Sequence, residues 1–203
     1  MDLHRLEAFS DGVLAVAITL LALDLAVSGP GHGTLLSQLE GRWPQFAAYI
    51  VSFVTIGVIW VNHHALFRAI ARVGRPVLFL NLLLLMSVVA IPFATSTVAT
   101  YLRAGGTDSH VAAALYGVVM ECMSIGFVAI FLVSHWAGHL VVPLGREDAR
   151  RAVVRFGLGI GAYAVAIAVA LVNAPAALVL NGLVALYYVS RRTPGEGEPS
   201  PEA

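Results

Sequence analysis

The stretch from residue 9 to residue 27 constrains the fold more than any other part of the chain. It is largely apolar but carries two acids, Asp11 near its start and Asp24 near its end. At ~1.5 Å per residue, about 20 helical residues span the ~30 Å hydrocarbon core of a bilayer. A carboxylate that faces lipid costs at least ~2 kcal/mol, so both acids are expected to face protein or water. The stretch therefore predicts a membrane-spanning helix.

Five further apolar stretches follow, and the composition agrees with an all-α integral membrane protein. Hydrophobic residues make up 59% of the 203 residues and charged residues 12%, whereas a soluble domain is roughly 45–50% apolar. Six spans are predicted, at residues 9–27, 45–67, 77–101, 111–134, 152–172 and 175–190. They would form one transmembrane domain over residues 1–192. Residues 193–203, rich in Pro, Gly, Ser and Glu, predict a disordered cytoplasmic tail.

The basic residues are distributed unequally between the two sides of these spans. All 12 are arginines, and only Arg42 and Arg103 fall on the side opposite the other ten. Because positive charge is retained in the cytoplasm, both termini are expected to lie there. This orientation requires an even number of spans, which six satisfies.

One face of the first predicted helix is smooth and apolar. On a 3.6-residue wheel this face contains Phe9, Gly12, Val16, Leu20 and Leu23. Thr19 lies at its edge, and Asp11 points the opposite way. Ordinary helix packing is the simplest interpretation of such a face when it is considered alone.

The start of the chain carries a recognisable motif, Arg5-x-x-x-Phe9-Ser10-Asp11-Gly12, followed by Thr19-Leu20-Leu21. It resembles the R-x-x-x-F-S-D-G signature of the transmembrane-protein-175 family, potassium channels of lysosomes and bacteria. The pattern of later spans is similar along nearly all of the first 190 residues. The resemblance implies a potassium-preferring cation channel rather than an enzyme, located in a bacterial cell (inner) membrane. It implies no cofactor beyond permeant K⁺, and as partners lipid and further copies of the chain but no nucleic acid.

The resemblance also implies four subunits around a four-fold axis, with the first helix lining the central pore. Val16, Leu20 and Leu23 would then form stacked apolar rings, which can gate by dewetting. Thr19 would add a hydroxyl ring that favours a partly dehydrated cation. The narrow point of the family falls at Val16, which is smaller than the expected Ile or Leu. Asp24 would place four carboxylates at the outer mouth and raise the local cation concentration.

Polar residues on three predicted helices lie at one depth. Asp11, His64 and Asn81 are two, three and four residues inside the cytoplasmic edges of their spans. These depths agree to within about one helical turn. Polar groups at one level in a membrane are best explained as hydrogen-bond partners. The resemblance likewise implies that the motif ties the first helix to the second and third. The predicted structural network comprises Arg5, Phe9, Ser10, Asp11, Trp60, His64 and Asn81.

Other ionisable residues support two alternative hypotheses. Glu121 lies near the middle of the fourth span, where an acid is costly, and both a packing role and a role in gating or assembly remain open for it. Together with Asp11 and His64 it could form the proton relay of a secondary transporter, although paired broken helices are lacking. An intramembrane metalloenzyme would use the histidines His63, His64, His135 and His139. No Cys or carboxylate accompanies His63 and His64. His135 and His139 have the i, i+4 spacing of metal ligands on a helix but lack a third ligand, so they are weak evidence for a metal site.

Two features are expected near the fifth span. Gly157 and Gly161 form a small-xxx-small pair, which predicts close contact with a neighbouring helix. Residues 145–155 are densely charged and predict a solvated cytoplasmic loop that faces lipid headgroups.

Overall fold

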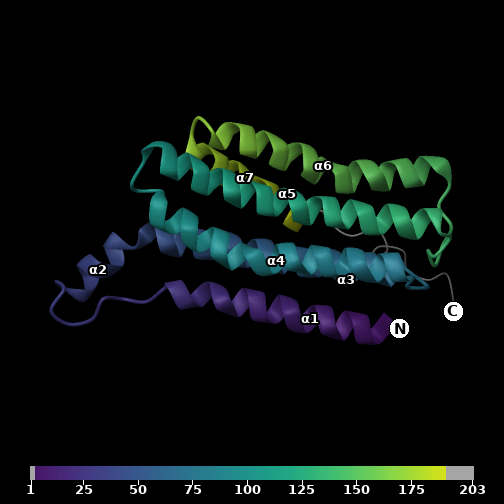
Figure 1. The fold of residues 1–203 in the computed structure, drawn as a ribbon, viewed down its shortest axis with the longest axis horizontal. Coiled ribbons are helices and arrows are strands. Elements are labelled where there is room, and N and C mark those ends of the chain that lie inside the picture. The colour runs from purple at the N-terminus through teal and green to yellow at the C-terminus, as the bar shows by residue number, and fades with distance from the viewer. Residues whose placement is uncertain (1–2, 191–203) are drawn as a thin grey trace, which may run out of the picture.

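The computed structural model describes residues 3–190, and in this part of the chain it is an elongated bundle of helices (Figure 1). The long helices run alternately in opposite directions along the bundle. In chain order the elements are α1 (Leu3–Leu20), the 3₁₀ helix η1 (Leu21–Asp24), α2 (Leu35–Gly41), α3 (Trp43–Arg68), α4 (Arg75–Tyr101), α5 (Gly106–Trp136), α6 (Arg146–Ala170) and α7 (Ala174–Ser190). The predicted tail, residues 193–203, lies outside the described residues.

The lengths of the helices confirm a multi-span, all-α membrane protein. Within residues 3–190, five helices are long and apolar enough to cross a bilayer: α1 continued by η1, α3, α4, α5 and α6. The sixth predicted span corresponds to α7, which is apolar but has only 17 residues. At ~1.5 Å per residue this helix is shorter than the ~30 Å hydrocarbon core.

The charged segment at residues 145–155 is helical, so its prediction as a loop was wrong. α6 begins at Arg146 and carries Glu147 and Asp148 in its first turn. Acidic side chains near a helix N-terminus interact favourably with the helix dipole, so α6 can begin within the charged segment, before its apolar stretch.

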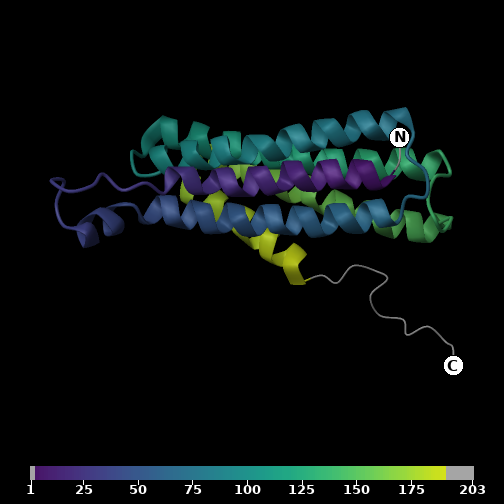
Figure 2. The same cartoon turned by 90° about the horizontal axis from the view of Figure 1, so that it is seen from below.

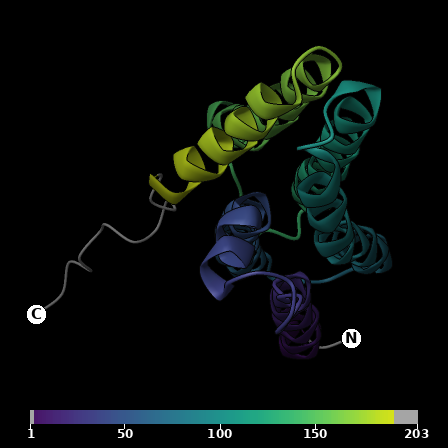
Figure 3. The ribbon, with the colours of Figure 1, turned by 90° about the vertical axis from the view of Figure 1, so that its left-hand side faces the viewer.

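The helices pack in an order that leaves α1 at the edge. α1 lies against α3 and α4, α4 packs on α5, and α5 packs on α6. Seen end-on, α1 and α6 occupy opposite sides of the bundle (Figure 3). α7 contacts α3, α5 and α6, and its C-terminal end diverges from the other helices (Figure 2).

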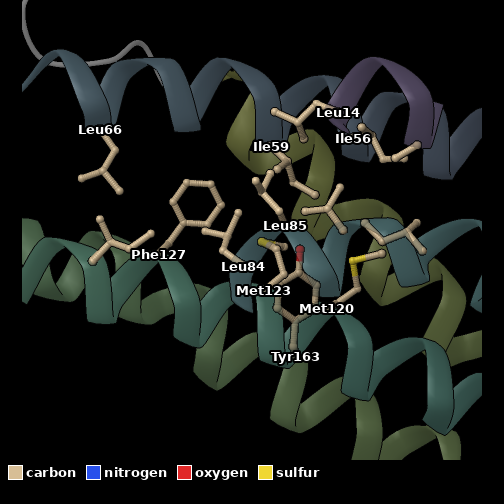
Figure 4. Close-up of a cluster of buried hydrophobic side chains, with 14 of the residues drawn as sticks. Leu14, Ile56, Ile59, Leu66, Leu84, Leu85, Met120, Met123, Phe127 and Tyr163 are labelled. Atoms are coloured by element: carbon tan, nitrogen blue, oxygen red, sulfur yellow. The ribbon is translucent and has the colours of Figure 1, made fainter. Parts of the chain in front are cut away.

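The core lies along the inner faces of α4 and α5. Buried positions on α4 recur three or four residues apart, including Leu84, Val88 and Ile91, each with none of its surface exposed. This spacing places them on one side of the helix. Side chains from α1, α3, α5 and α6 complete the cluster (Figure 4).

Close helix contacts occur at glycines other than the predicted pair. A Cβ atom built on Gly157 or Gly161 would meet nothing within 4 Å, so the prediction of a tight contact there was wrong. A Cβ on Gly126 of α5 would instead lie 3.1 Å from Leu84 Cβ of α4, and one on Gly117 would lie 2.7 Å from Ile167 Cγ1 of α6. The small-xxx-small spacing does not reveal which side of a helix faces a neighbour.

This difference predicts opposite effects for two Gly→Ala substitutions. Gly126→Ala forces α4 and α5 apart and is expected to lower the free energy of unfolding by about 1–3 kcal/mol, the usual cost of overpacking. Gly161→Ala is the matched control, because it meets no neighbour and gains up to ~1 kcal/mol of helix propensity. Thermal unfolding in detergent micelles measures both. Equal effects of the two substitutions would contradict the packing described.

Candidate functional site

The outward side of α1 is a continuous apolar surface, called here the α1 face, made of Phe9, Gly12, Val16, Leu20 and Leu23. Val16 is 56% exposed, Leu20 37% and Leu23 72%. The opposite side of the helix is buried against α3 and α4 through Leu6, Ser10, Leu14 and Ala17. Within residues 3–190 of one subunit, the α1 face is therefore the side of the helix that faces away from the bundle.

The last turn of this segment is tighter than the sequence predicts. The α-helix ends at Leu20, and η1 continues as a 3₁₀ helix to Asp24. A 3₁₀ helix has three residues per turn, so side chains at i and i+3 eclipse. Leu20 and Leu23 consequently align along one line. The helical segment ends at Asp24, three residues before the predicted boundary at Val27.

Thr19 presents its oxygen at the edge of the α1 face. Its hydroxyl donates a 2.8 Å hydrogen bond to the carbonyl of Val16, and the residue is exposed. Because the hydroxyl proton is used within the helix, the oxygen can act outward only as an acceptor. An acceptor oxygen is the kind of group that can coordinate a cation.

A buried chain of hydrogen bonds holds α1 against α3 and α4. Asn81 Nδ2 donates to Ser10 Oγ at 3.0 Å, and Ser10 Oγ donates to the carbonyl of Leu6 at 2.9 Å. Asn81 Oδ1 is therefore the acceptor for His63 Nε2 at 2.9 Å, which requires the proton on that nitrogen. The side chains of Ser10 and Asn81 are completely buried, and only 1% of the surface of His63 is exposed.

This arrangement corrects the expected role of His64. Asn81 bonds to His63, whereas His64 is exposed. Adjacent residues on a helix are rotated by about 100°, so only one of the two can face α4. His63 also stacks on Phe67, with ring centroids 4.5 Å apart.

Asp11 makes a separate contact with α3. Trp60 Nε1 donates a 3.0 Å hydrogen bond to Asp11 Oδ1 near the surface. Arg5 and Phe9 are exposed, and within residues 3–190 no hydrogen bond or ion pair joins Arg5 to another group. The predicted network is therefore divided into the buried chain through Ser10 and the Asp11–Trp60 bond.

A second buried network was missed in the sequence. Ser52 Oγ of α3 lies 2.7 Å from Thr95 Oγ1 of α4 and 3.2 Å from Tyr116 Oη of α5. Thr95 donates to the carbonyl of Ile91, so Ser52 donates to Thr95 and Tyr116 donates to Ser52. The three residues lie at comparable depths from the same end of the bundle. Their similar depths along three predicted helices are the sequence signal that predicts this network.

The residues of the alternative hypotheses are not brought together. Within residues 3–190, no hydrogen bond joins any two of Asp11, His64 and Glu121, and Glu121 Oε2 is buried without a partner. His135 and His139 lack helical i, i+4 geometry, because α5 ends at Trp136. In the same described range, no three His, Cys, Asp or Glu residues are placed to hold a metal ion.

The fold and the α1 face define a multi-span helical membrane protein in which one edge helix presents an uncovered apolar face. Residues 5–92 match the family described as the endosomal/lysosomal potassium channel TMEM175. A potassium channel of Streptomyces collinus is 48% identical over 192 residues, which cover 94% of this chain and 93% of that protein. The chain therefore belongs to the TMEM175 family, whose members are ion channels and not enzymes.

Structural comparison agrees with this assignment. The crystal structure of a lysosomal potassium-selective channel TMEM175 homolog from Chamaesiphon minutus matches with a TM-score of 0.81 and 33% identity. The match covers 92% of this chain and 96% of that one. The endosomal/lysosomal proton channel TMEM175 of Mus musculus is 33% identical over 172 residues, and this chain spans only 33% of its length.

The two adjacent histidines give a matched test of the buried chain. His63→Ala leaves Asn81 Oδ1 buried without a donor and is expected to lower the free energy of unfolding by about 1–3 kcal/mol. His64→Ala removes an exposed side chain and is expected to change it by less than ~0.5 kcal/mol. Thermal unfolding in detergent micelles measures the stability of both variants. A larger effect from His64→Ala would show that the bond to Asn81 is misassigned.

Proposed function

We propose that this chain forms a potassium-preferring cation channel, a homotetramer in which α1 of each subunit lines a central axis. The uncovered α1 face is the observation that carries the proposal. The names of the Streptomyces and Chamaesiphon relatives support potassium as the ion. We further propose that the channel spans a bacterial cell membrane six times, with α7 as the sixth crossing and both termini in the cytoplasm.

The position of α1 favours assembly around this helix over exposure of its outer side to lipid. α1 lies at an edge, so copies can meet there without rearranging the bundle. Val16, Leu20 and Leu23 alone would be compatible with lipid. The acceptor oxygen of Thr19 and the carboxylate of Asp24, both exposed, are costly in hydrocarbon and inexpensive beside water.

A central axis gives each of these groups a function. Rings of Val16, Leu20 and Leu23 side chains would exclude water when narrow and so stop ion flow. The ring of Thr19 oxygens would replace part of the hydration shell of a cation. Asp24, at the end of η1, would raise the cation concentration at the mouth. Passive conduction through such a path needs no cofactor.

The hydrogen bonds to α3 and α4 would set which side of α1 faces the axis. Ser10 is held inward by Asn81, and Asp11 is held to one side by Trp60. Rotation of α1 would break both contacts. The α1 face is thus kept turned away from its own subunit, where a neighbouring copy can meet it.

Bilayer recording tests the proposal directly. Purified protein in planar bilayers with K⁺ on one side and Na⁺ on the other is expected to give currents that reverse at a potential favouring K⁺. The absence of cation currents under all voltages and pH values tested would exclude a channel function. Saturable, pH-coupled uptake without unitary currents would favour the transporter hypothesis.

Proton conduction is the second candidate, because the Mus musculus, Homo sapiens and other vertebrate relatives carry the name proton channel. The same bilayers, bathed in large impermeant ions with a pH difference, separate the two. A reversal potential that follows the proton gradient indicates proton conduction. A current that appears only when K⁺ is added indicates potassium conduction.

Substitutions on the α1 face test its place in the pore. Leu20→Asn and Leu23→Asn add polar groups to a dewetted constriction, and lowering its barrier by ~1.4 kcal/mol would raise conductance about tenfold. Val16→Asn is expected to act in the same direction or to reduce the preference for K⁺ over Na⁺. Met86→Asn is the control, because Met86 is an apolar residue of α4 with comparable exposure, 65%. Unchanged currents in all three α1 variants would remove this face from the ion path.

A further inference from the structure

The outer surface formed by α6 and α7, on the opposite side of the bundle from α1, carries a shallow, open groove. One end is a hollow of about 460 Å³ at the start of α6, and the other is a hollow of about 650 Å³ farther along the helices. Val154 and Leu158 line both hollows, so the two are continuous. The groove uses none of the residues assigned to ion conduction.

The first hollow is basic. Arg150, Arg151 and Arg155 line it, with Tyr187 of α7 and Glu147, and a second acid, Asp148, lies beside Arg151. Arg151 lies 3.7 Å from Glu147 and 3.7 Å from Asp148 on the helix surface, and all three side chains are more than three-fifths exposed. Exposed pairs of this kind contribute little, so a phosphate group can replace the two acids. Arginine binds phosphate oxygens through two parallel N–H donors.

The second hollow is apolar and floored by glycine. Gly157 and Gly161 lie along it, and nothing occupies the space within 4 Å of a Cβ built on either. Leu180 and Val184 of α7 form the other wall. From Val154 to Val165 the groove follows α6 for 11 residues, about 16 Å at ~1.5 Å per residue. This length is close to half of the ~30 Å hydrocarbon core, the depth of one leaflet.

We propose that this groove binds one anionic phospholipid of the leaflet at the arginine-rich end of the bundle. Its phosphate lies against Arg150 and Arg151, and one acyl chain runs over Gly157 and Gly161. The excess of positive charge selects an anionic head group, and basic pockets between helices on the cytoplasmic side of membranes bind such head groups. The apolar continuation distinguishes a lipid from a free anion. Leucine side chains at the two glycines would fill the space that the acyl chain occupies.

Native mass spectrometry of the full-length protein, released from nanodiscs of equal phosphatidylglycerol and phosphatidylcholine, tests the proposal. Wild-type protein is expected to retain phosphatidylglycerol, one molecule per subunit, in preference to phosphatidylcholine. Arg150→Gln with Arg151→Gln is expected to weaken retention about fivefold for each arginine removed. Gly157→Leu with Gly161→Leu is expected to abolish retention while leaving the arginines in place. Excess inorganic phosphate is expected not to displace the lipid.

Two controls separate the groove from general effects of charge and bulk. Arg68→Gln with Arg72→Gln removes two exposed arginines from the same end of the bundle. Gly57→Leu adds a side chain to α3 at a glycine that also has nothing within 4 Å of its Cβ. Both controls are expected to retain phosphatidylglycerol as the wild type does, and circular dichroism shows that each variant is helical.

Several outcomes would overturn the proposal. Equal retention of the two lipids would show that the groove does not select charge. Unchanged retention in the glycine variant would show that no acyl chain lies over Gly157 and Gly161, and displacement by phosphate would reduce the site to an anion site. Dissociation of the oligomer in the glycine variant, with lipid still bound, would show that the groove is an interface between copies of the chain.

Discussion

The hydrogen-bond chain from His63 through Asn81 to Ser10 is the contact on which the placement of α1 depends. Hydrocarbon offers no water to satisfy a polar group, so each donor and acceptor in this chain requires a protein partner. The partners come from three helices, α3, α4 and α1. These hydrogen bonds can all form at only one rotation of α1 about its own axis. The exposure of Val16 and Leu20 on the other side of the helix follows from that rotation.

The rest of the bundle forms a support for this contact. α4 supplies Asn81 at one end and Thr95 at the other, where a second polar network ties it to α3 and α5. Between these two levels the contact is apolar, and Gly126 lets α5 approach Leu84 closely. Directional bonds near both ends and close packing between them make α4 the helix against which the others are positioned.

The two outer sides of the subunit differ in chemistry. The α1 face is apolar with one acceptor oxygen at its edge, which is what the proposed assembly of copies around an ion path requires. The α6–α7 groove is basic at one end and apolar along its length, which suits an amphiphilic molecule. Because α1 and α6 lie at opposite edges of the subunit, a ligand in the groove would not compete for space with ions at the proposed axis.

The sequence alone predicts the membrane-spanning helices, the family and the apolar side of α1. These depend on local properties: the length of an apolar stretch, the 3.6-residue period and a short motif. It places Asp11, His64 and Asn81 at one depth, because depth is measured along each helix. Packing in three dimensions is needed to show that His63 rather than His64 meets Asn81, and that Ser52, Thr95 and Tyr116 share hydrogen bonds. It is also needed to show that Gly126 rather than Gly161 is a close contact. Each of these depends on how far a helix is rotated about its own axis, and that rotation is set by packing against neighbours that are distant in the chain.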